Sequence, residues 1–170
     1  MLLPLIAAVL AVDLVRVPPS IREVTDPHTG IKVQVQVDGF EISRTEITQR
    51  QYASIRGGAA TAPDLPVGDV SWFDAIQFAN ALSRKEGLEV CYDERTGSRS
   101  KRVCNGYRLP TDAEWSRALE LADNLNVNLG LDTVATDPAR LLTLRSRPAP
   151  TGDRLVDMTG NLWEWCEDWF

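Results

Sequence analysis

Residues 160–170 read GNLWEWCEDWF and contain three of the five tryptophans, Trp163, Trp165 and Trp169, interleaved with acidic side chains and Cys166. Aromatic side chains bury large areas, and their polar tips need partners. We therefore expect this stretch to lie in the middle of a folded domain. Trp163 and Trp165 share one face of an extended segment, and we expect both in the core.

The composition is that of one soluble globular domain. The chain has 170 residues, of which 44% are hydrophobic and 25% charged, and this length supports a sizeable core. The formal net charge of -6 argues against nucleic acid as a partner, because nucleic-acid binding needs basic patches.

The first residues form an apolar run at 2–10 that is interrupted only by Pro4. This run is too short to cross a bilayer as a helix, so we expect no transmembrane span. Residues 1–11 are predicted to be a signal peptide or an N-terminal apolar segment. The alternatives are a buried first strand and a start codon assigned inside a longer leader. Export is favoured, which predicts an extracytoplasmic, periplasmic or secreted protein.

Cys91 and Cys104 flank the polar stretch YDERTGSRSKRV, which is typical of a hairpin or loop. A disulfide closing this loop would stabilise the fold by about 3 kcal/mol in the chain-entropy model and would fit export. The alternative is a pair of free thiols in a cytosolic protein. With three cysteines, one histidine and no CxxC spacing, a zinc site is not expected.

The pattern of elements is α+β. Weak alternation predicts a short strand at 12–17, and strong alternation predicts a half-buried strand at 31–37 that continues through Phe40 and Ile42. Helices are expected after the caps Thr48, Ser71 and Thr111. The last two caps are followed three residues later by Asp74 and Glu114, which predicts two capping boxes. Residues 123–150 show no firm pattern.

Few chemistries are open to these residues. His28, inside a turn sequence, is the only histidine, which excludes two-histidine metal sites and makes a serine-histidine triad improbable. Hard-cation binding stays open, because the carboxylates of Asp157 and Glu164 could converge with the carbonyls of Gly160 and Leu162 on calcium. On residue types alone the simpler interpretation is favoured, in which Asp157 starts a turn and Glu164 hydrogen-bonds backbone.

Four segments in one order carry a resemblance to a known family. They are DGFEISRTEITQRQY at 38–52, PVGDVSWFDAIQFANALSRKEGL at 66–88, NGYRLPTDAEWSRAL at 105–119 and VDMTGNLWEWCEDWF at 156–170. Together they resemble the formylglycine-generating enzymes, also called sulfatase-modifying factors. The resemblance covers residues 13–170 and implies a C-type-lectin-like α+β fold with short antiparallel strands, two main helices and much irregular loop.

The resemblance also implies a bound calcium ion. Its ligands would be Asp157, the Gly160 carbonyl, the Leu162 carbonyl and Glu164, so calcium binding becomes the favoured interpretation for these positions. A second calcium site of the family would fall within 124–137, where no recognisable pattern supports an assignment. The entry segment also departs from the family, since residues 17–20 read VPPS.

The family's oxidase activity uses Cu(I) on two cysteines that follow the WEW motif by several tens of residues. None of Cys91, Cys104 and Cys166 matches them, so no catalytic residue is assigned and copper is expected only if a missing C-terminal segment is supplied. The sequence predicts a C-terminally incomplete, non-catalytic domain that uses a calcium-ordered scaffold to bind a protein or small ligand. The alternative is a fragment of a copper-dependent oxidase that converts a sulfatase cysteine to formylglycine. The sulfoxide-synthase branch needs histidines and is discarded.

Three further side chains are assigned to structure. Trp72 and Trp115, at helix starts, are expected in the core. Arg108, within GYRLP, is expected to pair with a buried carboxylate.

Overall fold

The computed structural model of the protein describes residues 12–25, 29–100, 104–122 and 155–168. Residues 1–11, His28 and residues 123–150, which include the region of the second calcium site, lie outside the described residues. The elements are β1 (Leu14–Val17), β2 (Ser20–Thr25), β3 (Lys32–Val37), β4 (Phe40–Ser43), α1 (Gln49–Arg56), α2 (Trp72–Lys85) and α3 (Asp112–Leu121). No described helix has the length and apolar character needed to span a membrane.

The four strands form one long two-stranded ribbon that bends in the middle. β1 pairs antiparallel with β4, and β2 pairs antiparallel with β3. The register carries through the bend without slipping, because Val17 pairs with Phe40 and Ser20 pairs with Val37. The bend falls where Pro18 and Pro19 interrupt one strand, since proline supplies no N–H for the ladder.

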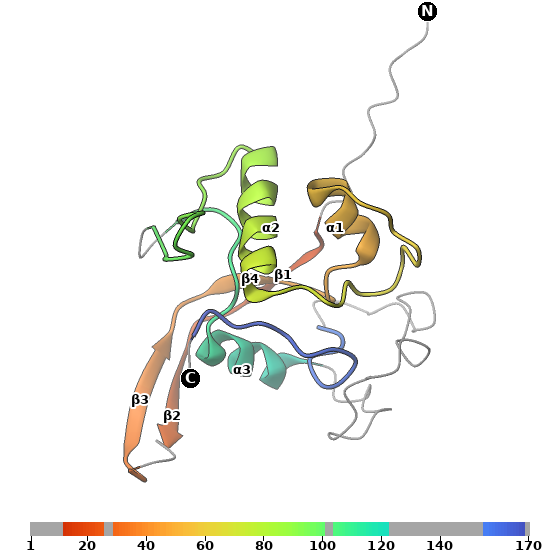
Figure 1. The fold of residues 1–170 in the computed structure, drawn as a ribbon. Helices are drawn as coiled ribbons and strands as arrows, with labels where there is room; N and C mark the ends of the chain where they lie inside the picture. Colours follow the sequence, from red (N-terminus) through yellow and green to blue (C-terminus); the bar gives the residue numbers. More distant parts are fainter. Residues whose placement is uncertain (1–11, 26–28, 101–103, 123–154, 169–170) are drawn as a thin grey trace, which may run out of the picture.

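The sequence predicted three of these strands and missed β2. The prolines at 18 and 19 hid the continuation of the first strand. The alternation at 31–37 is confirmed in part. Val37 is buried, whereas Val33 is 45% exposed and Ile31 61% exposed, because the outer half of the hairpin projects beyond the helices (Figure 1).

All three helices begin at the residues that the sequence indicated. The side chains of Thr48, Ser71 and Thr111 each accept a hydrogen bond from the backbone N–H three residues on. In each case the side chain of that third residue accepts a hydrogen bond from the backbone N–H of the cap residue. These reciprocal bonds satisfy amides that a helix start leaves without partners. Helices α1 and α2 pack through Tyr52 and Phe78, whose rings stack at 5.3 Å.

The core has two parts. One lies under α3 and the inner ribbon and is built on Val15, Val17, Ala118, Leu155 and Met158, with Trp115 packed against it. The other lies beside α2 and contains Ile76, Ala79, Cys91 and Tyr92, with Trp72 at its edge. The core positions expected for Trp72 and Trp115 are therefore confirmed, with both rings partly buried.

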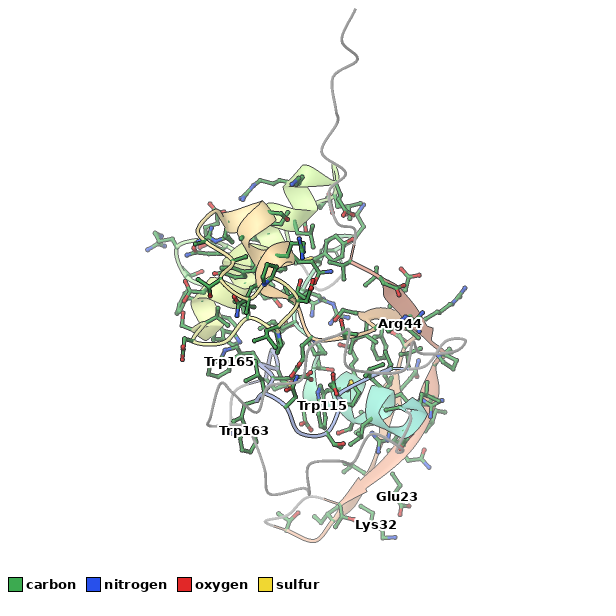
Figure 2. The ribbon with its side chains drawn as sticks, turned by 90° about the vertical axis from the view of Figure 1, so that its right-hand side faces the viewer. Glu23, Lys32, Arg44, Trp115, Trp163 and Trp165 are labelled. Atoms are coloured by element: carbon green, nitrogen blue, oxygen red, sulfur yellow. A yellow bond between two sulfur atoms is a disulfide. The ribbon has the colours of Figure 1, made fainter. Side chains whose placement is uncertain are left out.

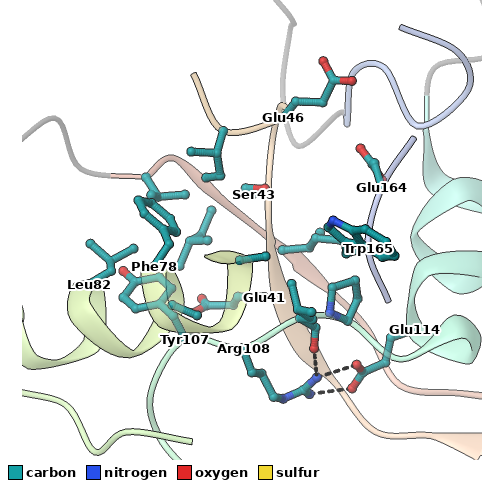
Figure 3. A pocket seen from close by; sticks show the side chains of 18 of the residues that line it. Glu41, Ser43, Glu46, Phe78, Leu82, Tyr107, Arg108, Glu114, Glu164 and Trp165 are labelled. Atoms are coloured by element: carbon teal, nitrogen blue, oxygen red, sulfur yellow. Dashed lines mark hydrogen bonds and ion pairs between the residues drawn. The ribbon is translucent and has the colours of Figure 1, made fainter. Parts of the chain in front are cut away.

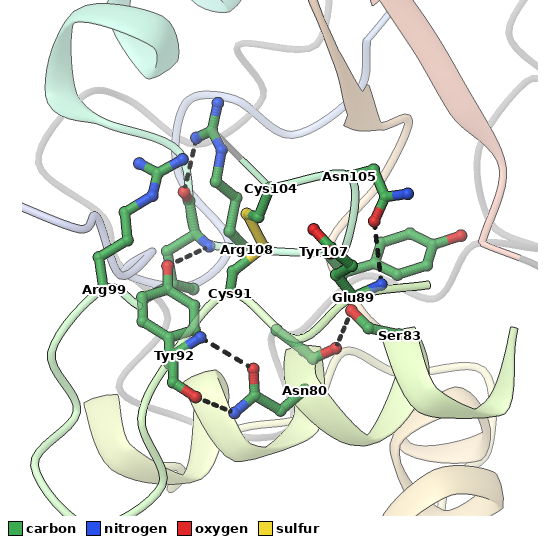
Figure 4. The surroundings of a disulfide bond; sticks show 12 residues. Asn80, Ser83, Glu89, Cys91, Tyr92, Arg99, Cys104, Asn105, Tyr107 and Arg108 are labelled. Atoms are coloured by element: carbon green, nitrogen blue, oxygen red, sulfur yellow. Dashed lines mark hydrogen bonds between the residues drawn. A yellow bond between two sulfur atoms is a disulfide. The ribbon is translucent and has the colours of Figure 1, made fainter. Parts of the chain in front are cut away.

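The expected Cys91–Cys104 disulfide is present, with the two Cα atoms 5.6 Å apart (Figure 4). Next to it the chain passes very close to the end of α2. A Cβ at Gly106 would lie 1.9 Å from the Glu89 carbonyl oxygen and 2.7 Å from Ser83 Oγ. The glycine of the GYRLP motif is therefore required by close backbone approach.

Candidate functional site

A half-open cavity of about 700 Å³ lies between β4, α2, the segment before α3 and residues 155–165. Its walls are mostly apolar and include Phe40, Ile42, Phe78, Leu82 and Leu109. Figure 3 shows β4 crossing the site, with Phe78, Leu82 and Tyr107 on one side of it and Glu164 and Trp165 on the other. Concave sites with apolar walls and a few polar groups are typical of ligand binding.

The cavity wall contains a two-bonded ion pair formed by Arg108 and Glu114. Two parallel N–H···O bonds of 2.6 Å join the guanidinium to the carboxylate, and the side chains are only 22% and 14% exposed. Burial by itself raises the pKa of Glu114, but the bonds from Arg108 and from the Thr111 N–H outweigh it and hold the pKa below its ordinary value. The bonds to Glu114 raise the pKa of Arg108. The expected carboxylate partner of Arg108 is thus Glu114.

The carboxylate of Glu46 binds the turn formed by the DMTGN motif at 157–161. Its Oε1 accepts a 3.0 Å hydrogen bond from the Leu162 N–H, and its Oε2 accepts a bond from Asn161 Nδ2. Asp157 and Asn161 have φ values of 66° and 62°, in the left-handed region that few residues adopt without support. Sequence reasoning missed Glu46, because no local pattern links residues 115 positions apart.

The end of the described chain is attached to the start of α3. The Glu167 N–H donates to the Pro110 carbonyl at 2.8 Å, and Asp168 Oδ2 accepts from the Asp112 N–H at 2.5 Å. A carboxylate at a helix N-terminus is favourable because the helix dipole is positive there. Glu167 also accepts two bonds from Arg99 Nη1, at 2.9 and 3.1 Å.

The two described tryptophans of the terminal segment, Trp163 and Trp165, are not in the core, and Trp169 lies outside the described residues. Trp163 is 84% exposed and Trp165 is 49% exposed, so the expectation of burial was wrong. The segment is held by polar contacts instead. Trp165 Nε1 donates to the Val70 carbonyl at 2.9 Å, and Trp72 Nε1 donates to the Cys166 carbonyl at 3.0 Å. Figure 2 shows Trp163 and Trp165 together on one side of the molecule.

Comparison with known proteins identifies the family. Residues 11–126 match the family described as the sulfatase-modifying factor enzyme 1-like domain. The chain belongs to this family. The resemblance drawn from the four sequence segments is therefore confirmed.

The curated relatives of this sulfatase-modifying-factor-like chain are distant and longer. The chain is 29% identical to "Chaperone protein LppX" of Paenibacillus barcinonensis, over 79% of this chain and 64% of the relative. It is 29% identical to the formylglycine-generating enzyme of Streptomyces coelicolor, over 71% of this chain and 38% of that enzyme. It is 27% identical to the enzyme of Thermomonospora curvata, over 64% and 35%. The chain thus spans between about a third and two thirds of the length of these relatives.

A solved structure supports the fold. Treponema denticola variable protein 1 superposes with a TM-score of 0.70 at 23% identity, over 92% of this chain and 73% of that chain. At this identity the likeness concerns the fold alone. It agrees with the α+β class expected from the sequence.

The four predicted calcium positions lie within one described stretch. Asp157 is buried, and Glu164 Oε2 accepts a hydrogen bond from Trp115 Nε1. Desolvation raises the pKa of the Glu164 carboxyl, and the hydrogen bond from Trp115 opposes this rise. Within the described ranges no group of three histidine, cysteine or acidic side chains is placed to hold a metal. The predicted set has two carboxylates and two carbonyls, so that finding does not test it.

The described cysteines offer no reactive thiol pair. Cys91 and Cys104 are joined, and Cys166 is the free one. Burial, followed by the charges of nearby Asp112 and Glu164, raises the pKa of the Cys166 thiol to about 11. Because the thiolate is the nucleophile and the metal ligand, a mostly protonated Cys166 is a weak nucleophile near neutral pH.

We predict that Glu114→Gln destabilises the protein by about 3 kcal/mol at neutral pH, because a charge of a partly buried pair loses its partner. The folded pKa of Glu114 is lowered, so its stabilising contribution is present above the unfolded pKa and is lost as the pH falls through the folded pKa. The difference in the free energy of unfolding between wild type and variant should therefore become smaller as the pH is lowered from about 7 to about 3. Urea unfolding at both pH values measures it.

The matched control for this prediction is Glu120→Gln on the same helix. Glu120 is 43% exposed and pairs with Arg22 and Arg117, so its loss should cost less than about 1 kcal/mol. If Glu114→Gln lowered the free energy of unfolding by the same amount at both pH values, the assigned ion pair would be contradicted.

Proposed function

We propose that this domain is an exported, non-catalytic binding domain of the sulfatase-modifying factor class. Its ligand or protein partner enters the cavity between β4, α2 and residues 155–165. The observation that carries the proposal is the cavity itself, of about 700 Å³, with apolar walls and a few polar groups such as Glu41 and Arg108 at its surface. The name of one relative, a chaperone, favours a polypeptide as the partner.

The state of the cysteines supports a non-catalytic role. Cu(I) is held by soft thiolate ligands. In the described part of the chain, Cys91 and Cys104 are committed to a disulfide and Cys166 stays protonated near neutral pH. The same disulfide supports export, because such bonds persist in oxidising compartments.

A second function is supported by two of the relatives. Both the Streptomyces coelicolor and the Thermomonospora curvata proteins are named formylglycine-generating enzymes. On this proposal the chain is a fragment of a copper-dependent oxidase that converts a sulfatase cysteine to formylglycine. A catalytic test separates the two functions.

We predict that the purified chain leaves a peptide of the CxPxR type unmodified in the presence of copper and O₂. Mass spectrometry of the peptide measures the outcome, and a formylglycine-generating enzyme assayed in parallel is the positive control. Conversion of the peptide cysteine to formylglycine by this chain would contradict the non-catalytic proposal and support the oxidase proposal.

Calcium is the cofactor that we propose for the scaffold. Two carboxylates and two backbone carbonyls form a hard-oxygen donor set of the kind that calcium takes. Asp157, Gly160 (carbonyl), Leu162 (carbonyl) and Glu164 would hold the ion, and Glu46 supports their turn through Asn161 and Leu162. The ion would order the segment that lines the cavity and would supply no redox chemistry.

We predict that calcium at about 100 times its dissociation constant stabilises the fold by about 2.7 kcal/mol, which corresponds to a rise in melting temperature of roughly 5–10 °C. Glu164→Ala should remove this increment, whereas Glu94→Ala, at an exposed turn position that is none of the four predicted ligands, should keep it. Differential scanning calorimetry with calcium and with chelator measures the increment. An identical increment in Glu164→Ala would remove Glu164 from the site.

A further inference from the structure

In the described part of the chain, no strand pairs with the outer edge of β3. Among the described residues β3 pairs with β2 alone. Figure 1 shows the β2–β3 hairpin extending past the helices, and Figure 2 shows Glu23 and Lys32 far out on it. A strand edge presents backbone donors and acceptors that template pairing with another chain.

This edge carries little of the usual protection. Natural edge strands are blunted by charged side chains, lysine above all, by proline or by bulges. Lys32, at the outer end of β3, is such a charge, and it pairs with Glu23 of the same hairpin at 2.6 Å. Residues 33–37 read VQVQV, with neither charge nor proline nor glycine, and valine favours strand pairing. Val33 and Ile31 are also apolar and exposed, at 45% and 61%.

The sequence of the edge is self-complementary. VQVQV reads the same in both directions, with Lys32 before it and Asp38 after it. In an antiparallel pairing centred on Val35, Val33 lies opposite the partner's Val37 and Gln34 opposite the partner's Gln36. Lys32 then lies opposite the partner's Asp38, and the two-fold axis repeats this ion pair at the other end. Such a self-matching patch is what a two-fold dimer interface requires.

The faces also match in this arrangement. Residues directly opposite each other in a sheet point to the same side. The valines of both copies therefore share one face, the one on which Val37 is already buried. Exposed Val33 would be covered by the partner's valines, and the glutamines would line the opposite, solvated face.

We propose that β3 pairs edge to edge with β3 of a second copy of this chain, in the register centred on Val35. Two hairpins then form one four-stranded antiparallel sheet. The dimer is weak, because a single strand edge buries less area than a standard interface. Its specificity comes from the two Lys32–Asp38 ion pairs, since a shift in register separates these residues. Within one copy Lys32 pairs with Glu23 at 2.6 Å and Asp38 accepts a bond from Gln36 at 3.0 Å, so each ion pair between copies exchanges with an exposed contact of the monomer.

Sedimentation equilibrium from about 10 μM to 1 mM, a range that covers weak association, tests the proposal at low ionic strength. Wild type should associate to a dimer. Asp38→Lys places like charges opposite each other twice and should weaken dimerisation about tenfold, which corresponds to about 1.4 kcal/mol. Glu94→Lys changes the net charge equally at an exposed turn and should leave the dimer unchanged.

Cross-linking provides the second readout, on a Cys166→Ser background. Val35 is the only β3 residue that faces itself across the axis, so Val35→Cys should form an intermolecular disulfide. Gln34→Cys should not, because the two thiols lie diagonally. A monomer at all concentrations overturns the proposal, and so does a dimer that Asp38→Lys leaves intact or that Gln34→Cys cross-links as well as Val35→Cys. If Asp38→Lys fails to fold by circular dichroism, the cross-linking result decides.

Discussion

The ion pair of Arg108 and Glu114 is the contact on which the rest of the site depends. Glu114 binds Arg108 through both carboxylate oxygens and also accepts the N–H of Thr111, the cap of α3. One side chain therefore fixes the direction of the GYRLP segment and the start of the helix together. Both side chains are mostly buried, at 22% and 14% exposed, so removing either partner leaves a poorly solvated charge.

The terminal segment is bound by residues next to this ion pair. The Leu109 N–H donates to the Tyr92 hydroxyl at 2.9 Å, which links the segment to the core beside α2. The Pro110 carbonyl and the Asp112 N–H then bind Glu167 and Asp168, and Trp115 binds Glu164. Residues 164–168 are thus held mainly by polar contacts, whereas Leu155 and Met158, earlier in the same stretch, pack in the core under α3. This explains how a segment with two exposed tryptophans keeps a defined path.

Local chemistry could be predicted from the sequence, and distant pairing could not. The capping boxes at Ser71 and Thr111 were predictable because their partners lie three residues apart. The disulfide and the family were also recognised. The strand β2 was hidden by Pro18 and Pro19, and the contact from Glu46 to Leu162 had no sequence signal. The burial expected for Trp163 was wrong because composition shows that a ring needs contacts but does not show which face of a segment receives them.

Amide hydrogen exchange at residues 164–168 tests most directly whether the Arg108–Glu114 pair organises the terminal segment. If it does, Glu114→Ala should remove protection both at the start of α3 and at the distant Glu167 N–H, while α2 stays protected and Glu120→Ala leaves the pattern unchanged. Loss of protection confined to the first turn of α3, with Glu167 still protected, would show that the terminal segment is held independently and would contradict the central role of the pair.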